Sequence, residues 1–118
     1  MLFRSEDVLE RQGTKPDFLI LAYPVITMME PYVHHGSLKY LLGDDPDPGL
    51  VRLLSAETRV TKDTPPTFLF TTTDDKTVPV MNSVMFYEAL VKAGVPAEMH
   101  IFQHGAHGAG LEIGRAHV

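Results

Sequence analysis

The segment TFLFTTTDDKTVPVMNSVMFYEALVKAGVPAEMHIF, residues 67–102, holds two short strands and the helix between them. Its first six residues, TFLFTT, are β-branched and aromatic and follow a Pro-Pro pair, which favours a strand over 67–72. Apolar residues then recur every three to four positions over 80–93, which predicts an amphipathic helix that ends at Gly94. We expect this helix to bury Val80, Val84, Tyr87 and Val91. The run AEMHIF predicts another strand over 97–102. Strand, helix and strand in this order imply parallel strands with a right-handed connection.

Upstream of this unit, the sequence predicts one more strand and a long excursion. Residues 18–22, FLILA, form a continuous apolar run, which is typical of a strand buried on both faces in a parallel sheet. Residues 26–64 lose strand character and hold signals for two short helices. Ser37 is a candidate N-cap of a helix through Leu42, and Asp47 caps another that begins at Pro48. The sequence therefore predicts the α/β class, with a parallel sheet and flanking helices.

Composition excludes several classes of protein. The chain has 118 residues, is 44% hydrophobic and carries a formal net charge of -5, with lysine and arginine scattered along it. Such a chain is globular and is not expected to bind nucleic acid. No apolar run approaches the roughly 18 residues of a membrane-spanning helix, and the start lacks the apolar core of a signal peptide. We therefore expect no membrane partner.

The two ends do not match the rest of the chain. Residues 1–5 (MLFRS) and 112–118 (EIGRAHV) read as translations of short DNA adaptors used in sequencing libraries. We expect both to be non-native scars and residues 6–111 to be the C-terminal fragment of one domain. Consistent with an incomplete domain, three strands and one long helix leave the sheet edges uncovered.

Two loops that follow predicted strands carry titratable side chains. Asp74 and Asp75 lie in the loop after residues 67–72, and His104 and His107 lie in the glycine-rich loop after residues 97–102. Functional groups of parallel sheets collect at the carboxyl ends of strands. A carboxylate that orients an imidazole forms two of the three members of a nucleophilic triad. Here the Asp precedes the His by one helix and one strand, which agrees with the chain order Ser, Asp, His of the α/β-hydrolase fold.

The whole pattern resembles a known family. The segments PDFLILAYPVITM, HGS, LLGDDPDP, TPPTFLFTTTDDKTVPVMNSVMFYEAL and KAGVPAEMHIFQHGAHGAGL resemble the C-terminal half of α/β-hydrolases of the acetyl-esterase and dienelactone-hydrolase-like branch. This branch includes xylan-associated esterases and is akin to the prolyl oligopeptidase catalytic domain. The resemblance implies a serine carboxylesterase acting on a small-molecule or carbohydrate ester, with no cofactor. It also implies that Asp75 is the triad acid and His107 the general base.

One family feature is missing from the sequence. No Gly-x-Ser-x-Gly motif occurs, and Ser37, Ser55 and Ser83 lack the flanking glycines of a nucleophile elbow. We therefore expect the chain alone to be inactive. The resemblance also places His35 near the substrate entrance, although an exposed loop is the slightly favoured explanation of this residue. Met28 and Tyr32 are candidates to line an acyl or alcohol pocket, and core packing explains them equally well.

Other readings of the same residues remain open. Asp74 is expected to be a turn residue, and His104 to be solvated or close behind the catalytic pair. His100, His104 and His107 have the spacing of a zinc-binding helix face, but the glycines around them oppose a helix, so no metal site is expected. A peptidase of the prolyl oligopeptidase type is an alternative within the hydrolases. A non-catalytic interaction module is the alternative outside them, and a defined oligomer would favour it.

Overall fold

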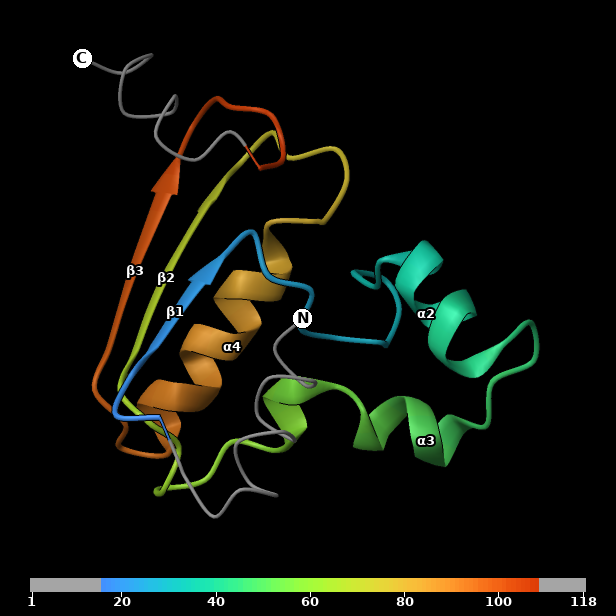
Figure 1. Cartoon of the computed structure of the whole chain (residues 1–118), viewed down its shortest axis with the longest axis horizontal. Coiled ribbons are helices and arrows are strands. Elements are labelled where there is room, and N and C mark those ends of the chain that lie inside the picture. Colours follow the sequence, from blue (N-terminus) through green and yellow to red (C-terminus); the bar gives the residue numbers. More distant parts are fainter. Residues whose placement is uncertain (1–15, 109–118) are drawn as a thin grey trace.

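The computed structural model describes residues 16–108 and consists of a small parallel sheet with helices packed beside it (Figure 1). The proposed scars at residues 1–5 and 112–118 lie outside the described residues, and the extent of the native domain over 6–111 stays a prediction. Along the chain the elements are β1 (Leu19–Ala22), α2 (His35–Leu42), α3 (Pro48–Leu53), a 3-10 turn (Ala56–Thr58), β2 (Thr67–Thr72), α4 (Met81–Lys92) and β3 (Ala97–Phe102).

The three strands form one sheet in the order β1, β2, β3, and both neighbouring pairs are parallel. Leu21 of β1 lies opposite Leu69 of β2, and Leu69 lies opposite Met99 of β3. The parallel direction means that all three strands end at the same edge of the sheet. This arrangement confirms the predicted class, a parallel sheet with flanking helices.

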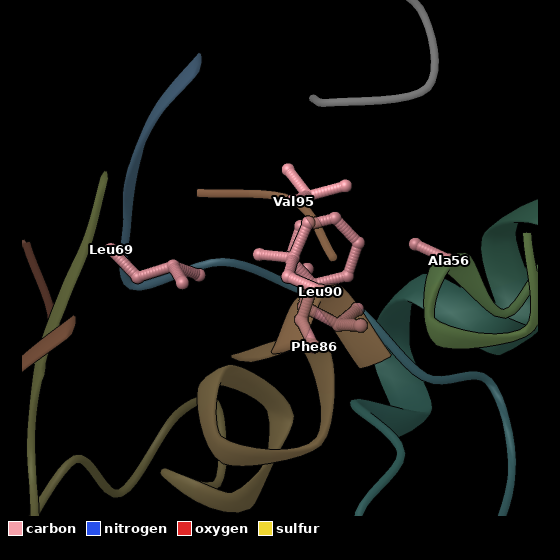
Figure 2. Packing of buried hydrophobic residues seen from close by; sticks show 6 residues of the cluster. Ala56, Leu69, Phe86, Leu90 and Val95 are labelled. Carbon is pink, nitrogen blue, oxygen red and sulfur yellow. The ribbon is translucent and has the colours of Figure 1, made fainter. Parts of the chain in front are cut away.

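The core lies between the sheet and α4. Leu69 from β2 and Phe86 and Leu90 from α4 are fully or almost fully buried against one another, and Ile26, Ala56 and Val95 complete the cluster (Figure 2). Burial of each large side chain of this kind contributes roughly 1.5–3 kcal/mol. The core therefore joins the sheet, the long helix and the excursion that follows β1.

The face of α4 that is buried differs from the predicted one. The helix buries Asn82, Ser83, Phe86 and Leu90, whereas Val91 is 55% exposed and Val80, Val84 and Tyr87 are half-buried. The reason is that the buried hydrogen bonds of Asn82 turn this residue inward at the start of the helix, with Ser83 buried beside it, which sets the rotation of the later turns. Counting only apolar residues gave a face displaced by one position.

Strand β1 is also less buried than its sequence predicts. Its exposure alternates, and Phe18 just before it and Ile20 within it are 62% and 63% exposed. Among the described residues, β1 pairs only with β2, and α4 covers just the face that carries Leu69. The expected burial on both faces is therefore wrong for this structure, because side chains alternate between the two faces of a strand.

The two short helices form where they were predicted, with one change of cap. Asp47 caps α3 by accepting a hydrogen bond from the backbone N–H of Leu50 at 3.1 Å. The N-cap of α2 is His34, not Ser37, because Nδ1 of His34 accepts a hydrogen bond from the backbone N–H of Ser37 at 3.1 Å. The imidazole thus takes the N-cap role that Ser, Thr, Asp or Asn usually has. Within residues 16–108, no helix has the length and apolar character needed to cross a membrane.

Candidate active site

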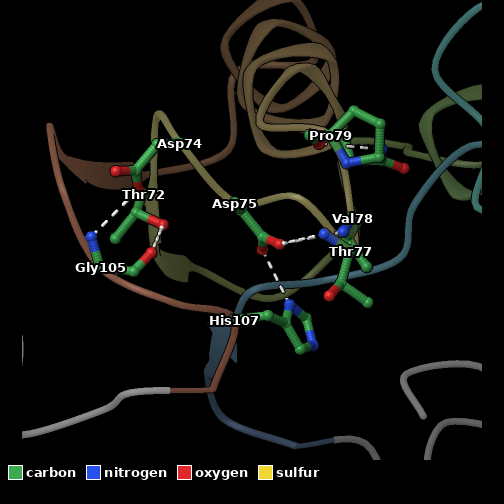
Figure 3. Close-up of polar contacts among 9 residues, drawn as sticks. Thr72, Asp74, Asp75, Thr77, Val78, Pro79, Gly105 and His107 are labelled. Atoms are coloured by element: carbon green, nitrogen blue, oxygen red, sulfur yellow. Dashed lines mark hydrogen bonds and ion pairs between the residues drawn. The ribbon is translucent and has the colours of Figure 1, made fainter.

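Asp75 lies in the turn that follows β2 and is held from two sides. Its Oδ1 accepts hydrogen bonds from the backbone N–H groups of Thr77 at 2.8 Å and Val78 at 3.0 Å. The side chain of Asp75 is 0% exposed. An aspartate commonly binds the backbone two or three residues ahead in a turn. This local geometry fixes the carboxylate and leaves its other oxygen, Oδ2, directed away from the turn (Figure 3).

His107 meets that free oxygen from the loop after β3. Its Nδ1 lies 2.8 Å from Oδ2 of Asp75, across 32 positions of sequence. The imidazole also packs edge-on against the ring of Tyr23, which directly follows β1, with 5.2 Å between the ring centroids. The second ring nitrogen, Nε2, points away from Asp75, and the side chain is 35% exposed (Figure 3). The ends of all three strands therefore contribute to the placement of this ring.

This pair has the chemistry of an oriented base. An ionised carboxylate only accepts hydrogen bonds, so Nδ1 of His107 donates to Oδ2 of Asp75. The neutral ring then carries its proton on Nδ1, and Nε2 has a free lone pair. Such an imidazole can remove a proton from a hydroxyl group that approaches Nε2, and the buried carboxylate stabilises the resulting cation.

A second contact between the same two loops was not foreseen in the sequence. Oδ2 of Asp74 lies 3.1 Å from Nδ1 of His104, and Oδ1 of Asp74 accepts a hydrogen bond from the backbone N–H of Gly105 at 3.0 Å. The hydrogen bond with His104, helped by that of Gly105, lowers the pKa of the Asp74 carboxyl below its ordinary value of 3.8. Asp74 was expected to be only a turn residue. The sequence signal for this second contact was that each loop carries two such residues, Asp74 and Asp75 in one and His104 and His107 in the other.

The three residues proposed for a substrate entrance make their contacts elsewhere. His35 is exposed, and its Nε2 lies 2.6 Å from Oε1 of Glu30. Met28 is 1% exposed, and the carbonyl of Tyr32 accepts a hydrogen bond from Nδ2 of Asn82 at 2.8 Å. All three lie in or directly after the loop that leaves the carboxyl end of β1, which is the sheet edge that carries Asp75 and His107.

The histidines with metal-like spacing do not converge. His100 lies on β3 with Nε2 2.6 Å from Oε2 of Glu98, while His104 and His107 each face a different aspartate in the loops. In the part of the chain that the structure describes, no group of three or more histidine, aspartate or glutamate side chains is arranged to hold a metal ion.

Comparison with known proteins places this geometry in context. A model of the prolyl oligopeptidase family matches residues 8–117. Among curated proteins, the chain is 37% identical over 101 residues to an acetylxylan esterase of Xylanibacter ruminicola, covering 82% of this chain and 21% of that protein. It is 40% identical over 94 residues to endo-1,4-beta-xylanase B of Butyrivibrio fibrisolvens, covering 80% of this chain and 15% of that protein.

Solved structures show the same likeness. The acetyl ester-xyloside bifunctional hydrolase of Caldicellulosiruptor lactoaceticus superposes with a TM-score of 0.80 at 55% identity, over 83% of this chain and 36% of that chain. A carboxylesterase of Lactobacillus plantarum superposes with a TM-score of 0.68 at 27% identity, over 91% of this chain and 37% of that chain. The 118 residues thus span little more than a third of these hydrolases.

Proposed function

The chain belongs to the prolyl oligopeptidase family, and from this membership we propose that it is the C-terminal part of a serine carboxylic-ester hydrolase. The observation that carries the proposal is the 2.8 Å hydrogen bond between Asp75 and His107 at the carboxyl ends of parallel strands. In this proposal Asp75 is the acid and His107 the general base of a triad. The nucleophilic serine comes from a part of the enzyme that these 118 residues do not include.

The proposed reaction proceeds in two steps. The serine hydroxyl attacks the ester carbonyl while Nε2 of His107 takes its proton, and the same nitrogen returns the proton to the leaving alcohol as the acyl-enzyme forms. Water then attacks the acyl-enzyme, again with Nε2 as base, and releases the acid and the serine. Throughout, Asp75 holds the Nδ1 proton and stabilises the imidazolium. The residues proposed for this cycle call for no cofactor.

The proposed substrate is a short acyl ester, such as an acetylated sugar or polysaccharide. The names of two relatives support this class, because one is an acetylxylan esterase and another an acetyl ester-xyloside hydrolase. We further propose that Tyr32 and His35 lie near the substrate entrance and that Met28 packs beside them. Their position after the carboxyl end of β1 supports this placement, since the loops at that edge surround a site in parallel sheets.

The name of the matching family favours a second candidate, a peptidase of the prolyl oligopeptidase type. The same Asp75 and His107 serve both reactions, because the triad attacks esters and amides alike. The two candidates are separated by substrate preference and not by the catalytic pair.

A chimeric enzyme tests the proposal. Residues 16–108 replace the matching region of the Caldicellulosiruptor hydrolase, to which this chain is 55% identical. We expect the chimera to release acetate from acetylated xylan and from p-nitrophenyl acetate. His107→Ala and Asp75→Asn should each lower kcat by about a thousandfold or more. His100→Ala is the matched control, because His100 lies on β3 away from Asp75, and it should retain activity.

Two outcomes would contradict the proposal. If the folded chimera hydrolyses the ester and His107→Ala is as active as His100→Ala, His107 is not the base. If the chimera cleaves a prolyl peptide and not the acetyl ester, the peptidase hypothesis replaces the esterase hypothesis.

Variants Tyr32→Ala and His35→Ala should raise KM more than they lower kcat if these residues lie at the entrance.

A further inference from the structure

We propose that Asp74 and Thr72 are positioning residues that clamp the backbone of Gly105 and so hold His107 against Asp75. The inference rests on the proposed role of His107, and it assigns a function to a second acid that the triad does not use. It is carried by a set of contacts between the end of β2 and the loop after β3.

Both polar backbone groups of Gly105 are bound by side chains from the end of β2. The N–H of Gly105 donates to Oδ1 of Asp74 at 3.0 Å, and Oγ1 of Thr72 donates to the carbonyl of Gly105 at 2.7 Å (Figure 3). Thr72 itself is 0% exposed, so its hydroxyl is held by a packed strand end. A residue bound through both its donor and its acceptor cannot rotate about its own backbone without breaking a hydrogen bond.

Gly105 needs such a clamp because of its backbone conformation. Its φ of 146° lies in a region that glycine enters far more readily than other residues. Glycine also has the largest backbone freedom of any residue, so an unbound Gly105 would act as a hinge between β3 and His107. Only one residue, Ala106, separates Gly105 from His107. The clamp therefore restricts backbone rotation at Gly105, two residues before the base.

The clamp also fixes the base relative to the acid. Asp74 and Asp75 are consecutive, so the peptide segment that grips Gly105 also carries the carboxylate that meets His107. The backbone N–H of Thr73 donates to the carbonyl of Phe102 at 2.8 Å, which ties the same segment to the end of β3. Three consecutive residues, 73–75, therefore each contact either the end of β3 or the loop that follows it. A displacement of about 1 Å at such a site is enough to impair catalysis.

The second oxygen of Asp74 adds a contact with the ring of His104 at 3.1 Å. This contact lies on the solvent side, where the side chain of His104 is 67% exposed and that of Asp74 is 45% exposed. It favours the ionised form of Asp74, which is the stronger acceptor for the N–H of Gly105.

Hydrogen exchange of the full 118-residue chain, followed by nuclear magnetic resonance, tests the clamp. Asp74→Ala removes the acceptor, and we expect the amide of Gly105 and the Nδ1 proton of His107 each to exchange about tenfold faster. Asp74→Asn keeps an oxygen acceptor and should stay within about threefold of the wild type. Thr72→Val removes the other hydrogen bond and should also speed exchange of the His107 proton. Asp45→Ala, an exposed acid between α2 and α3, is the matched control and should change neither proton.

The amides of α4 report whether each variant is folded. Unchanged exchange in Asp74→Ala overturns the clamp, and so does faster exchange at Gly105 with an unaltered His107 proton. Asp74→Asn behaving like Asp74→Ala also overturns it, since the hydrogen bond would then not be the cause. If Asp74→Ala loses α4 protection, Thr72→Val decides, and a wild-type His107 proton in that variant overturns the proposal. The activity of the His107→Ala chimera tests the triad separately, because exchange rates in this chain do not depend on catalysis.

Discussion

Two adjacent acids, Asp74 and Asp75, differ in burial and in their partners. Asp75 is shielded from solvent and accepts two backbone hydrogen bonds before it meets His107. Asp74 is 45% exposed at its side chain and binds His104 and Gly105. The two side chains contact different partners, so one segment serves two purposes. The buried acid is placed to act on the imidazole, and the exposed acid to act on the loop that carries it.

The lowered pKa of Asp74 predicts a change of stability in acid. A group whose folded pKa is depressed stabilises the fold at pH values above its unfolded pKa, and this contribution is lost as the pH falls through the folded pKa. For Asp74 the ordinary value is 3.8, and its folded value is lower because of the hydrogen bond with His104. We expect the wild type to be more stable than Asp74→Asn above about pH 4, and the difference to shrink as the pH falls further and to vanish once the pH has passed the folded pKa.

Urea unfolding of both proteins between about pH 2 and pH 6 measures this difference. The control is Asp45→Asn, which should follow the wild type at every pH. A gap between the wild type and Asp74→Asn that persists unchanged at the acid end would show that ionisation of Asp74 does not stabilise the fold.

At the residue scale, the sequence predicted that Asp75 and His107 would pair, but not the neighbouring contacts that fix their positions. Asp75 and His107 stand after strands and match the family pattern, so they could be named from the sequence. The hydrogen bonds of Gly105 with Asp74 and Thr72 join residues 31 and 33 positions apart, and no local pattern encodes such a pair. The contact of Tyr23 with His107 was missed for the same reason.

At the scale of elements, α4 is anchored by one buried amide. Oδ1 of Asn82 accepts hydrogen bonds from the backbone N–H groups of Ile26 at 2.9 Å and Thr27 at 3.0 Å. Its Nδ2 donates to the carbonyls of Tyr32 at 2.8 Å and Pro79 at 3.0 Å. Every donor and acceptor of the side chain is thus used. Asn82 connects the loop after β1 to the start of the helix that follows the Asp75 turn.

Replacing this amide should be costly. Asn82→Ala leaves buried backbone groups without partners, at about 1–3 kcal/mol for a single such group. We expect the free energy of unfolding to fall by at least about 3 kcal/mol. Thermal or urea unfolding measures the change. Glu88→Ala is the control, because Glu88 is exposed on the same helix and its removal should cost little. A loss for Asn82→Ala no greater than for Glu88→Ala would mean that water or a shifted loop satisfies these groups.

The same residue explains why strands were easier to predict than the helix face. Strands over 67–72 and 97–102 match β2 and β3, and the helix over 80–93 matches α4 within one residue at each end. The rotation of α4, however, follows Asn82 and Ser83, which are polar and buried. Hydrophobic periodicity assumes that buried residues are apolar, so it misplaces a helix that buries an amide and a hydroxyl.

At the scale of the whole molecule, the sheet has two unlike faces. Leu69 and its neighbours pack against α4, while Ile20, which lies opposite Phe68, is 63% exposed on the other face. The apolar run at 18–22 predicted cover on both faces, and that cover is not present in residues 16–108. An apolar run shows which side chains of a strand can be buried, but it does not show which other elements cover them.

The parallel sheet explains why the residues of the candidate site lie together. Tyr23, Asp75 and His107 come from the ends of β1, β2 and β3, and the parallel direction brings these ends to one edge. What this edge supplies is an imidazole hydrogen-bonded to a buried carboxylate. In its proposed role as base, His107 needs a nucleophile, and the sequence contains no Gly-x-Ser-x-Gly motif to present one.

We therefore expect the 118-residue chain by itself to be inactive as an esterase. Within residues 16–108, no hydroxyl is hydrogen-bonded to Nε2 of His107, and water alone lacks the acyl-enzyme route and the oxyanion hole. Acetate release from acetylated xylan should be no faster with the wild-type chain than with His107→Ala, measured at equal concentration. Activity that exceeds the His107→Ala control would contradict this prediction. Full activity in the chimera together with none in the isolated chain would instead assign the missing step to the segment that carries the serine.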